Sequence, residues 1–221
     1  MGGVRPFEGV VFDADGVLFD TERLHRNAWI VIGEQMGCPN IVDHYLDCIG
    51  KTSADIRTLI RSATSPQFPL EEFSQRVTAL CLEQLRREVP MKPGVKEILS
   101  FLKERNVPVG LATSTYRERA MMRLDLTGLT PYFSVILTGD DVSHGKPDPE
   151  IYRTACQKLS IDPAHSIAIE DSRNGILSAH EAGMQVIMVP DLIPPSPDLD
   201  ELLFQRFDSL MDVRNYLENL L

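Results

Sequence analysis

Two carboxylates lie two residues apart at the end of an apolar run near the N-terminus. The stretch VVFDADG contains Asp13 and Asp15, followed by Gly16, and the run before them has the pattern of a buried strand. A carboxylate can bind a metal ion, exchange a proton or act as a nucleophile. Because such acid pairs also occur in turns and helix caps, this pair needs companions before it indicates a site.

Three further polar clusters follow predicted strands or lie in the loops that link them. Thr113 and Ser114 belong to LATST, Lys146 to HGKPDPEIY, and Glu170 and Asp171 to IAIEDS. Each cluster alone has an ordinary explanation as a helix cap or a surface loop. Because the carboxyl ends of parallel strands meet at one edge of a sheet, where open α/β folds bind ligands, their joint occurrence predicts one shared site.

Five apolar runs bounded by turn residues predict the buried strands of a parallel sheet. They are Gly9–Phe12, Pro108–Ala112, Phe133–Leu137, Ser166–Ile169 and Gln185–Val189. Segments with helical periodicity lie before, between and after the last four strands in the chain. The predicted helices are Val95–Arg105, Tyr116–Leu126, Pro149–Leu159, Asn174–Ala182 and Ser209–Leu221. The alternation predicts a Rossmann-like, doubly wound α/β core.

The segment from Thr21 to Met91 interrupts this alternation. It contains no convincing strand pattern and shows helical periodicity over Glu22–Met36, Ser53–Ser62 and Leu70–Val89. We therefore expect an all-helical domain at residues 21–91, inserted into an α/β domain made of residues 1–20 and 92–221. The proline-rich segment Pro190–Asp200 is expected to be a loop.

The composition is that of a globular protein and argues against several classes. Of 221 residues, 43 % are hydrophobic and 24 % charged, and no apolar run reaches the roughly 18 residues of a membrane helix. The net charge of −10 argues against binding to nucleic acid or to anionic membranes. Four cysteines without a CxxC pair, and an N-terminus unlike a signal peptide, predict a reduced, cytoplasmic protein, which we expect to be a monomer.

The four polar clusters, in this order, resemble the motifs of the haloacid dehalogenase (HAD) superfamily of phosphotransferases. FDADGVLFDTE resembles its first motif, LATST its second, GKPDPEIY its third and IEDSRNGILSAHEAGMQVI its fourth. The resemblance covers nearly the whole chain. It is to the branch with a helical cap inserted after the first motif, which includes β-phosphoglucomutase and many small phosphatases. A HAD-like core and a cap that closes over the site are therefore implied.

This resemblance implies a role for each catalytic residue. Asp13 would attack phosphorus and form an aspartyl-phosphate, and Asp15 would protonate the leaving oxygen and then act as base for water. Thr113 would bind the phosphoryl oxygens with Ser114 nearby, and Lys146 would neutralise charge. An acid at Asp15 favours phosphate chemistry over dehalogenation, because a halide leaves without protonation.

The charges at this site predict a divalent cation. Asp13, Glu170, Asp171 and a phosphate sum to roughly −5, whereas Lys146 supplies a single positive charge. Oxygen ligands without a His or Cys cluster favour Mg²⁺ over zinc. The resemblance implies that Asp13, the main-chain carbonyl of Asp15, and Asp171 ligate the ion, with Glu170 at or near it.

The helical insert contains the residues expected to select the substrate. DTERLHRNAW resembles a stretch of β-phosphoglucomutase in which the positions of His25 and Trp29 face the substrate. Alternatively, Trp29 packs inside the cap and His25 is an ordinary surface histidine. Ser53 stands where the mutase has an arginine that grips the distal phosphate. Lys51 is retained as a candidate substrate-binding residue, although neither it nor Arg57 is in register with that arginine.

These inferences predict a Mg²⁺-dependent phosphatase that hydrolyses a small phosphomonoester, such as a sugar phosphate, through an aspartyl-phosphate. Two alternatives stay open. One is a phosphotransferase of the β-phosphoglucomutase type, and the other is a catalytically idle protein that binds a phosphorylated metabolite. The presence of Asp13, Asp15, Lys146 and Asp171 together argues against the idle protein, because a sensor needs neither a nucleophile nor an acid.

Overall fold

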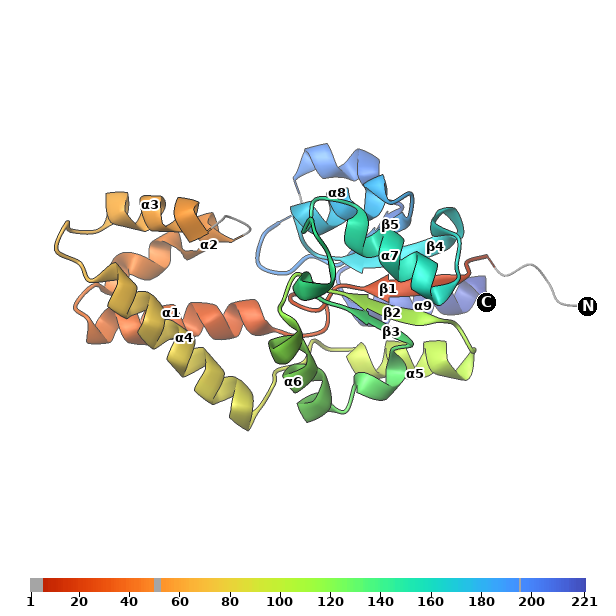
Figure 1. Ribbon diagram of the computed structural model, residues 1–221, viewed down its shortest axis with the longest axis horizontal. Coiled ribbons are helices and arrows are strands. Elements are labelled where there is room, and N and C mark those ends of the chain that lie inside the picture. Colours follow the sequence, from red (N-terminus) through yellow and green to blue (C-terminus); the bar gives the residue numbers. More distant parts are fainter. Residues whose placement is uncertain (1–5, 50–52, 195) are drawn as a thin grey trace, which may run out of the picture. The chain divides into compact units, whose positions relative to one another are not determined.

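The α/β part of the chain is built on one sheet of parallel strands. The computed structural model describes residues 6–49, 53–194 and 196–221. The strands are β1 (Gly9–Phe12), β2 (Val109–Ala112), β3 (Val135–Leu137), β4 (Ser166–Glu170), β5 (Gln185–Met188) and β6 (Gln205–Arg206). They lie in the order β3-β2-β1-β4-β5-β6, so the first strand of the chain is central (Figure 1).

Helices cover both faces of this sheet (Figure 1). α7 (Glu150–Leu159) and α8 (Arg173–Glu181) pack on one face, and α5 (Val95–Glu104) packs against α9 (Leu210–Leu220) on the other. α6 (Arg117–Thr127) lies between β2 and β3 in the chain. Short 3-10 turns complete the connections, at Thr130–Tyr132, Gly139–Asp141, Pro163–His165 and Pro197–Leu202. This is the doubly wound arrangement that the alternating pattern predicts.

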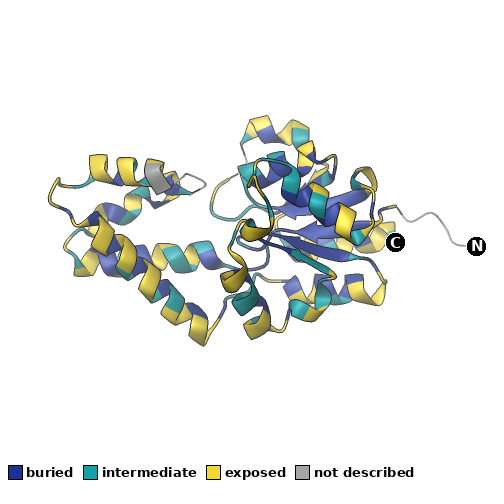
Figure 2. Ribbon diagram, in the orientation of Figure 1, coloured by how far each residue is buried: buried dark blue, intermediate teal, exposed yellow. Residues whose placement is uncertain are grey.

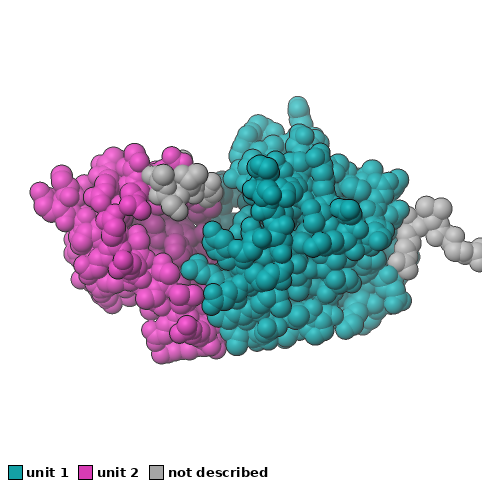
Figure 3. Space-filling view, in the orientation of Figure 1, with its two compact units in different colours: residues 1–19, 91–221 teal, residues 20–90 magenta. Residues whose placement is uncertain are grey.

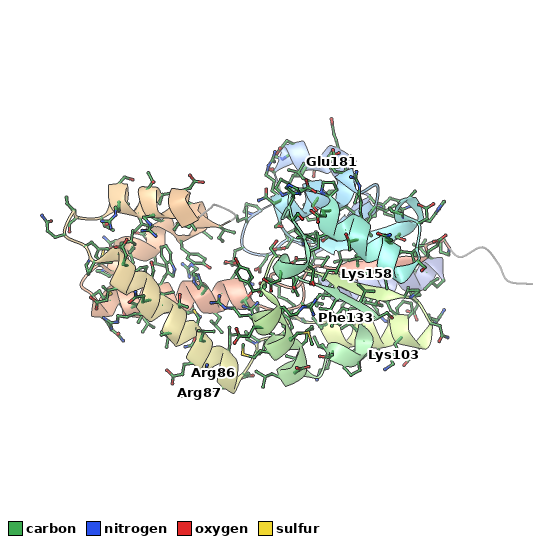
Figure 4. The ribbon with its side chains drawn as sticks, viewed as in Figure 1. Arg86, Arg87, Lys103, Phe133, Lys158 and Glu181 are labelled. Carbon is green, nitrogen blue, oxygen red and sulfur yellow. The ribbon has the colours of Figure 1, made fainter. Side chains whose placement is uncertain are left out.

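The inner strands of the sheet are buried on both faces, which explains why they are almost continuously apolar (Figure 2). Val11 of β1 and Ala168 of β4 face α7 and α8, where they join Ile151 and Ile176 in one core cluster. Alternate strand residues point to the opposite face. On that face the ring of Phe12 packs edge-on against the ring of Phe133. The helices on both faces expose charged residues to solvent, such as Lys103 of α5 and Lys158 of α7 (Figure 4).

The chain divides into two compact units. One comprises Met1–Phe19 with Met91–Leu221, and the other is Asp20–Pro90 (Figure 3). The second unit contains α1 (Thr21–Gln35), a 3-10 helix (Pro39–His44), α2 (Tyr45–Cys48), α3 (Ser53–Ala63) and α4 (Leu70–Arg87). No strand occurs among its described residues. No helix in the described part of the chain is long and apolar enough to cross a membrane.

Aromatic residues form the core of the helical unit. Trp29 of α1 is buried, and its ring centroid lies 5.2 Å from that of Tyr45 and 5.2 Å from that of Phe73 in α4, both in edge-on contacts. Such contacts add stability beyond the burial of apolar area. The unit therefore has a hydrophobic core of its own, separate from the core of the sheet.

Two of the differences between the observed and the expected elements have a clear physical reason. The strand β6 has only two residues, both exposed, so it has no apolar run that a sequence pattern could detect. Pro197–Leu202 forms a 3-10 helix inside the segment that was expected to be a loop. Pro197 suits its first turn because proline fixes the backbone in a helix-compatible conformation, and Leu199 anchors it in the core.

We predict that Phe73→Ala destabilises the helical unit by about 3–5 kcal/mol, because it opens a cavity beside Trp29. The measurement is urea unfolding followed by tryptophan fluorescence, since Trp29 is the only tryptophan in the chain. The exposed Gln75 lies in the same helix, and Gln75→Ala should change the free energy of unfolding by less than about 0.5 kcal/mol. Equal unfolding midpoints for the two variants would contradict this account of the core.

Candidate active site

The register of the sheet brings the ends of three strands to one level. Phe12 of β1 pairs with Leu111 of β2 and with Ile169 of β4. The next residue, Asp13, therefore lies beside the end of β2 and the end of β4, and its amide donates a hydrogen bond to the carbonyl of Ile169 at 3.0 Å. β2 and β4 lie on opposite sides of β1, which makes this edge the switch point of the doubly wound sheet.

Lys146 joins all three of these strand ends through its ammonium group. Its Nζ donates to Oδ1 of Asp13 at 2.5 Å, to Oε1 of Glu170 at 2.6 Å and to the carbonyl of Ala112 at 2.9 Å. The Lys146 side chain is only 5 % exposed. A buried ammonium is tolerated only with such partners, so the loop that carries Lys146 is tied to both carboxylates.

Glu170 is fully buried, and both of its carboxylate oxygens accept hydrogen bonds. Tyr152 donates its hydroxyl to Oε1 at 2.7 Å, and Ser172 donates its hydroxyl to Oε2 at 3.1 Å. Gly175, in the first turn of α8, lies directly against this carboxylate, and a Cβ there would overlap it. The glycine therefore leaves the space in which Glu170 is held at the start of α8.

Asp13, Glu170 and Asp171 form an acidic cluster that fits a metal ion. Each offers a carboxylate oxygen, and these oxygens lie within 4.8 Å of one another. Gly16, with a φ of +84°, turns the loop after Asp15 so closely against Asp171 that a side chain at Gly16 would overlap the carboxylate. An all-oxygen ligand set of this kind suits a hard divalent cation.

The pKa values in this cluster are strongly perturbed. Burial raises the pKa of Asp13 to about 7, helped by the charge of Glu170 and opposed by that of Lys146. Burial also raises the pKa of Asp171 well above its ordinary value, and Glu170 and Asp13 add to the effect. Burial alone would lower the pKa of Lys146, but the charges of Asp13 and Glu170 raise it above its ordinary value. Without a cation, burial and mutual repulsion therefore disfavour full ionisation of this cluster, and a bound cation would favour it.

Asp15 lies beyond Asp13 in the same loop, and two residues that follow β2 contact it. The Thr115 hydroxyl donates to Oδ2 of Asp15 at 2.6 Å, and the guanidinium of Arg123 in α6 forms an ion pair with Oδ1. The Asp15 side chain is 28 % exposed, more than that of Arg123 at 12 %. The carboxylate is therefore held from the α6 side while part of it stays accessible to solvent.

Thr113 and Ser114 lie where β2 ends. Thr113 is buried, and its hydroxyl accepts a hydrogen bond from the amide of Thr115 at 3.1 Å, which turns the chain toward α6. Ser114 is exposed, and its carbonyl leaves no room for a side chain at Gly139. The α/β unit therefore gathers Lys146 and the three acids of the cluster, Asp13, Glu170 and Asp171. Thr113 is close in the chain, because it directly follows Ala112, whose carbonyl accepts a hydrogen bond from Lys146.

The substrate-binding residues expected in the insert belong to the helical unit. Trp29 is a buried core residue there, as described above. His25 lies on the same helix, with its ring centroid 5.7 Å from that of Tyr45, and burial lowers its pKa. Lys51 lies outside the described residues, and of Ser53 only its place at the start of α3 is described. The substrate-binding role of these residues stays a prediction.

Two residues at the site were not anticipated from the sequence, Arg123 and Tyr152, whereas Thr115 belongs to the polar cluster that follows the second predicted strand. Arg123 had a readable signal, because it lies three residues after Ala120 and beside Leu124, both buried, and so shares the inward face of α6. A charged residue on a buried helix face needs a partner. The sequence does not distinguish Tyr152 in this way, because a buried tyrosine on the inner face of α7 is typical of a hydrophobic core.

Comparisons with known proteins agree with this geometry. The sequence pattern of the haloacid dehalogenase-like hydrolases matches residues 10–189. A phosphorylated carbohydrates phosphatase of Thermotoga maritima is 36 % identical over 180 residues, which are 81 % of this chain and 83 % of that protein. A validoxylamine A 7'-phosphate phosphatase of Streptomyces hygroscopicus is 33 % identical over 178 residues, covering 80 % of this chain and 83 % of that protein.

A solved structure shares the fold over almost its whole length. It is a protein of Thermotoga maritima provisionally named a beta-phosphoglucomutase, 32 % identical, with a TM-score of 0.82 over 97 % of this chain and 100 % of that one. The matched sequence pattern, the two phosphatases and this shared fold converge on one family. The chain therefore belongs to the haloacid dehalogenase-like hydrolases, as an enzyme with phosphatases among its relatives.

Proposed function

We propose that this enzyme is a Mg²⁺-dependent phosphatase that hydrolyses small phosphomonoesters, with sugar phosphates as the leading substrate class. The observation that carries the proposal is the Lys146 ammonium between Asp13 and Glu170 at the switch point of the sheet. This contact supports a site in which Asp13 is the nucleophile and Lys146 is a fixed cation beside the acidic cluster. The substrate class is supported by the relative named a phosphorylated carbohydrates phosphatase.

In the first step Asp13 attacks phosphorus and the bond to the leaving oxygen breaks. Lys146, which contacts Asp13, offsets the negative charge that gathers around phosphorus. Asp15 gives its proton to the departing alcohol oxygen. In the second step the ionised Asp15 takes a proton from water, the water oxygen attacks the aspartyl-phosphate, and inorganic phosphate leaves while the Asp13 carboxylate is restored.

The acidic cluster is the proposed Mg²⁺ site. Asp13, Asp171 and the main-chain carbonyl of Asp15 would hold the ion, with Glu170 at or near it. Such an ion, when bound, offsets the repulsion between the acids and the substrate phosphate. Glu170 also keeps Lys146 in place, since its oxygens accept hydrogen bonds from Lys146, Tyr152 and Ser172.

We assign substrate selection to the helical unit, as a cap in the usual sense of a lid that excludes water and chooses the leaving group. Its candidate substrate-binding residues are His25, Trp29 and Lys51. For Trp29 the role would be indirect, because its ring packs against Tyr45 and Phe73. The support for this assignment is the resemblance of the insert to the helical caps of the family.

A second candidate function is a phosphosugar mutase, favoured by the solved structure that is provisionally named a beta-phosphoglucomutase. A mutase must hold its sugar by a distal phosphate so that a sugar hydroxyl reaches the aspartyl-phosphate before water does. An arginine suits this task because its planar fork matches phosphate oxygens. Ser53 occupies that position in the sequence, which favours water as the acceptor.

The nucleophile is tested by Asp13→Asn. The amide keeps the shape of the side chain but cannot attack phosphorus, so phosphate release should fall by at least about 10³-fold. The assay is release of inorganic phosphate from a panel of sugar phosphates, with circular dichroism to check that the fold persists. Asp208 is exposed in the same unit, and Asp208→Asn should keep full activity. Turnover by Asp13→Asn near that of the wild type would refute the mechanism.

Mg²⁺ should support turnover and stabilise the protein more at pH about 8 than at about 5.5. The pKa of Asp13 is raised from 3.8 to about 7 in the folded, metal-free protein. The contribution of Asp13 to the free energy of unfolding is therefore complete below pH 3.8 and is lost as the pH rises through about 7. Mg²⁺ binds the ionised form, so its effect grows over the same range.

The measurement for this prediction is the melting temperature with EDTA and with Mg²⁺ at the two pH values, together with phosphate release. Asp171→Asn should lose most of the Mg²⁺-dependent rise in melting temperature. A rise that is the same at both pH values, or full turnover in EDTA, would show that the cluster is not the metal site.

The acceptor is tested with β-glucose 1-phosphate and a trace of glucose 1,6-bisphosphate. We expect inorganic phosphate to accumulate, because the sequence offers no cap arginine in register to hold the distal phosphate. Glucose 6-phosphate and free phosphate are followed in the same reaction. Rapid formation of glucose 6-phosphate with negligible phosphate release would establish the mutase instead.

A further inference from the structure

Arg123 makes an ion pair that stability alone does not explain. Its side chain is 12 % exposed, and its Nε is buried without a hydrogen-bond acceptor among the described residues. Removing an arginine from water and leaving one of its donors unpaired costs free energy. Replacing a buried ion pair by apolar side chains is often neutral or stabilising. The contribution of Arg123 therefore lies in its effect on the residue that it contacts.

That partner is Asp15, which acts as acid and base in the proposed function. Arg123 contacts Oδ1 of Asp15, while the Thr115 hydroxyl contacts Oδ2 at 2.6 Å. A carboxylate gripped at one oxygen can still rotate about its last bond. When both oxygens are held from fixed elements, here the turn after β2 and the helix α6, the plane of the carboxylate is fixed as well.

The two contacts differ in what they permit. A guanidinium can only donate hydrogen bonds, so the oxygen that faces Arg123 is not the one that carries a proton. A threonine hydroxyl can either donate or accept, so Thr115 can contact Asp15 in both of its protonation states. Together the two contacts hold both carboxylate oxygens of Asp15 from the α6 side.

We propose that Arg123 is a positioning residue for Asp15, which together with Thr115 orients the carboxylate so that its proton reaches the leaving oxygen of an unactivated phosphate ester. This inference rests on the proposed function. It names a residue of α6 that the four sequence motifs do not contain. The consequence tested below concerns the first step, in which the alcohol departs.

That consequence depends on the leaving group. Nitrophenolate departs as a stable anion and needs no proton, whereas a sugar alkoxide must be protonated as its bond to phosphorus breaks. The quantity kcat/KM reports the steps up to and including that departure. A variant that misplaces Asp15 should therefore lose kcat/KM for a sugar phosphate and keep it for 4-nitrophenyl phosphate.

The test compares Arg123→Met, Arg123→Lys and the wild type on glucose 6-phosphate and 4-nitrophenyl phosphate. For Arg123→Met we expect kcat/KM to fall about 10²-fold on glucose 6-phosphate and less than about 3-fold on 4-nitrophenyl phosphate. Arg123→Lys keeps the charge and should recover part of the loss. Arg119 is exposed on the same helix, so Arg119→Met is the matched control and should change neither value.

A double-mutant cycle separates positioning from a general structural effect. In an Asp15→Asn background, Arg123→Met should cost little further activity on glucose 6-phosphate, because the group that it positions is already gone. Equal losses on both substrates, or full additivity with Asp15→Asn, would overturn the inference. Unchanged kinetics in Arg123→Met would overturn it as well.

The wild-type measurements keep this inference distinct from the proposed function. If the wild type releases phosphate from neither compound, the proposed function itself fails. If it hydrolyses both and the Arg123 variants behave like Arg119→Met, only the positioning role fails. A wild type that acts on the aryl ester alone has no need of a positioned acid, which also overturns the inference.

Discussion

The site depends on one buried cation placed between carboxylates. Lys146 lies within 2.6 Å of oxygens of both Asp13 and Glu170, and all three side chains are at most 10 % exposed. At such distances, in surroundings less polar than water, the attraction is strong enough to fix the loop after β3 against the ends of β1 and β4. The strand order serves this contact, because only a central β1 can have the ends of β2 and β4 beside it.

The same cluster carries more negative charge than Lys146 can offset. Asp13 and Asp171 both have raised pKa values, which means that the folded chain opposes their full ionisation when no cation is bound. Gly16 and Gly175 add to this crowding of acids. A side chain at Gly16 would overlap the carboxylate of Asp171, and one at Gly175 would overlap that of Glu170. The protein thus concentrates acids at a cost in stability, which is intelligible if a divalent cation and a phosphate are what it binds.

The parts of this site that the sequence predicted lie at strand ends or, for Lys146, in a loop that links two strands. Asp13, Thr113 and Glu170 each stand where an apolar run ends. Because the carboxyl ends of parallel strands meet at one edge of the sheet, the residues at these ends could be predicted to lie together. Arg123 and Tyr152 come from helices, and a helix pattern shows which face is buried without showing what that face meets. The two-residue β6 was missed because its pairing depends on neighbouring strands rather than on its own side chains.

In the proposed mechanism, every group that acts on phosphorus lies within the α/β unit: Asp13 as nucleophile, the cation Lys146, the acidic cluster, and Asp15 with its support from Thr115 and Arg123. None of these groups distinguishes water from a sugar hydroxyl as the second acceptor, because Asp15 can take a proton from either. Under that proposal, the helical unit, to which we assign substrate selection, makes the choice between phosphatase and mutase. Because one fold can host different reactions, an α/β core of this kind is compatible with either acceptor.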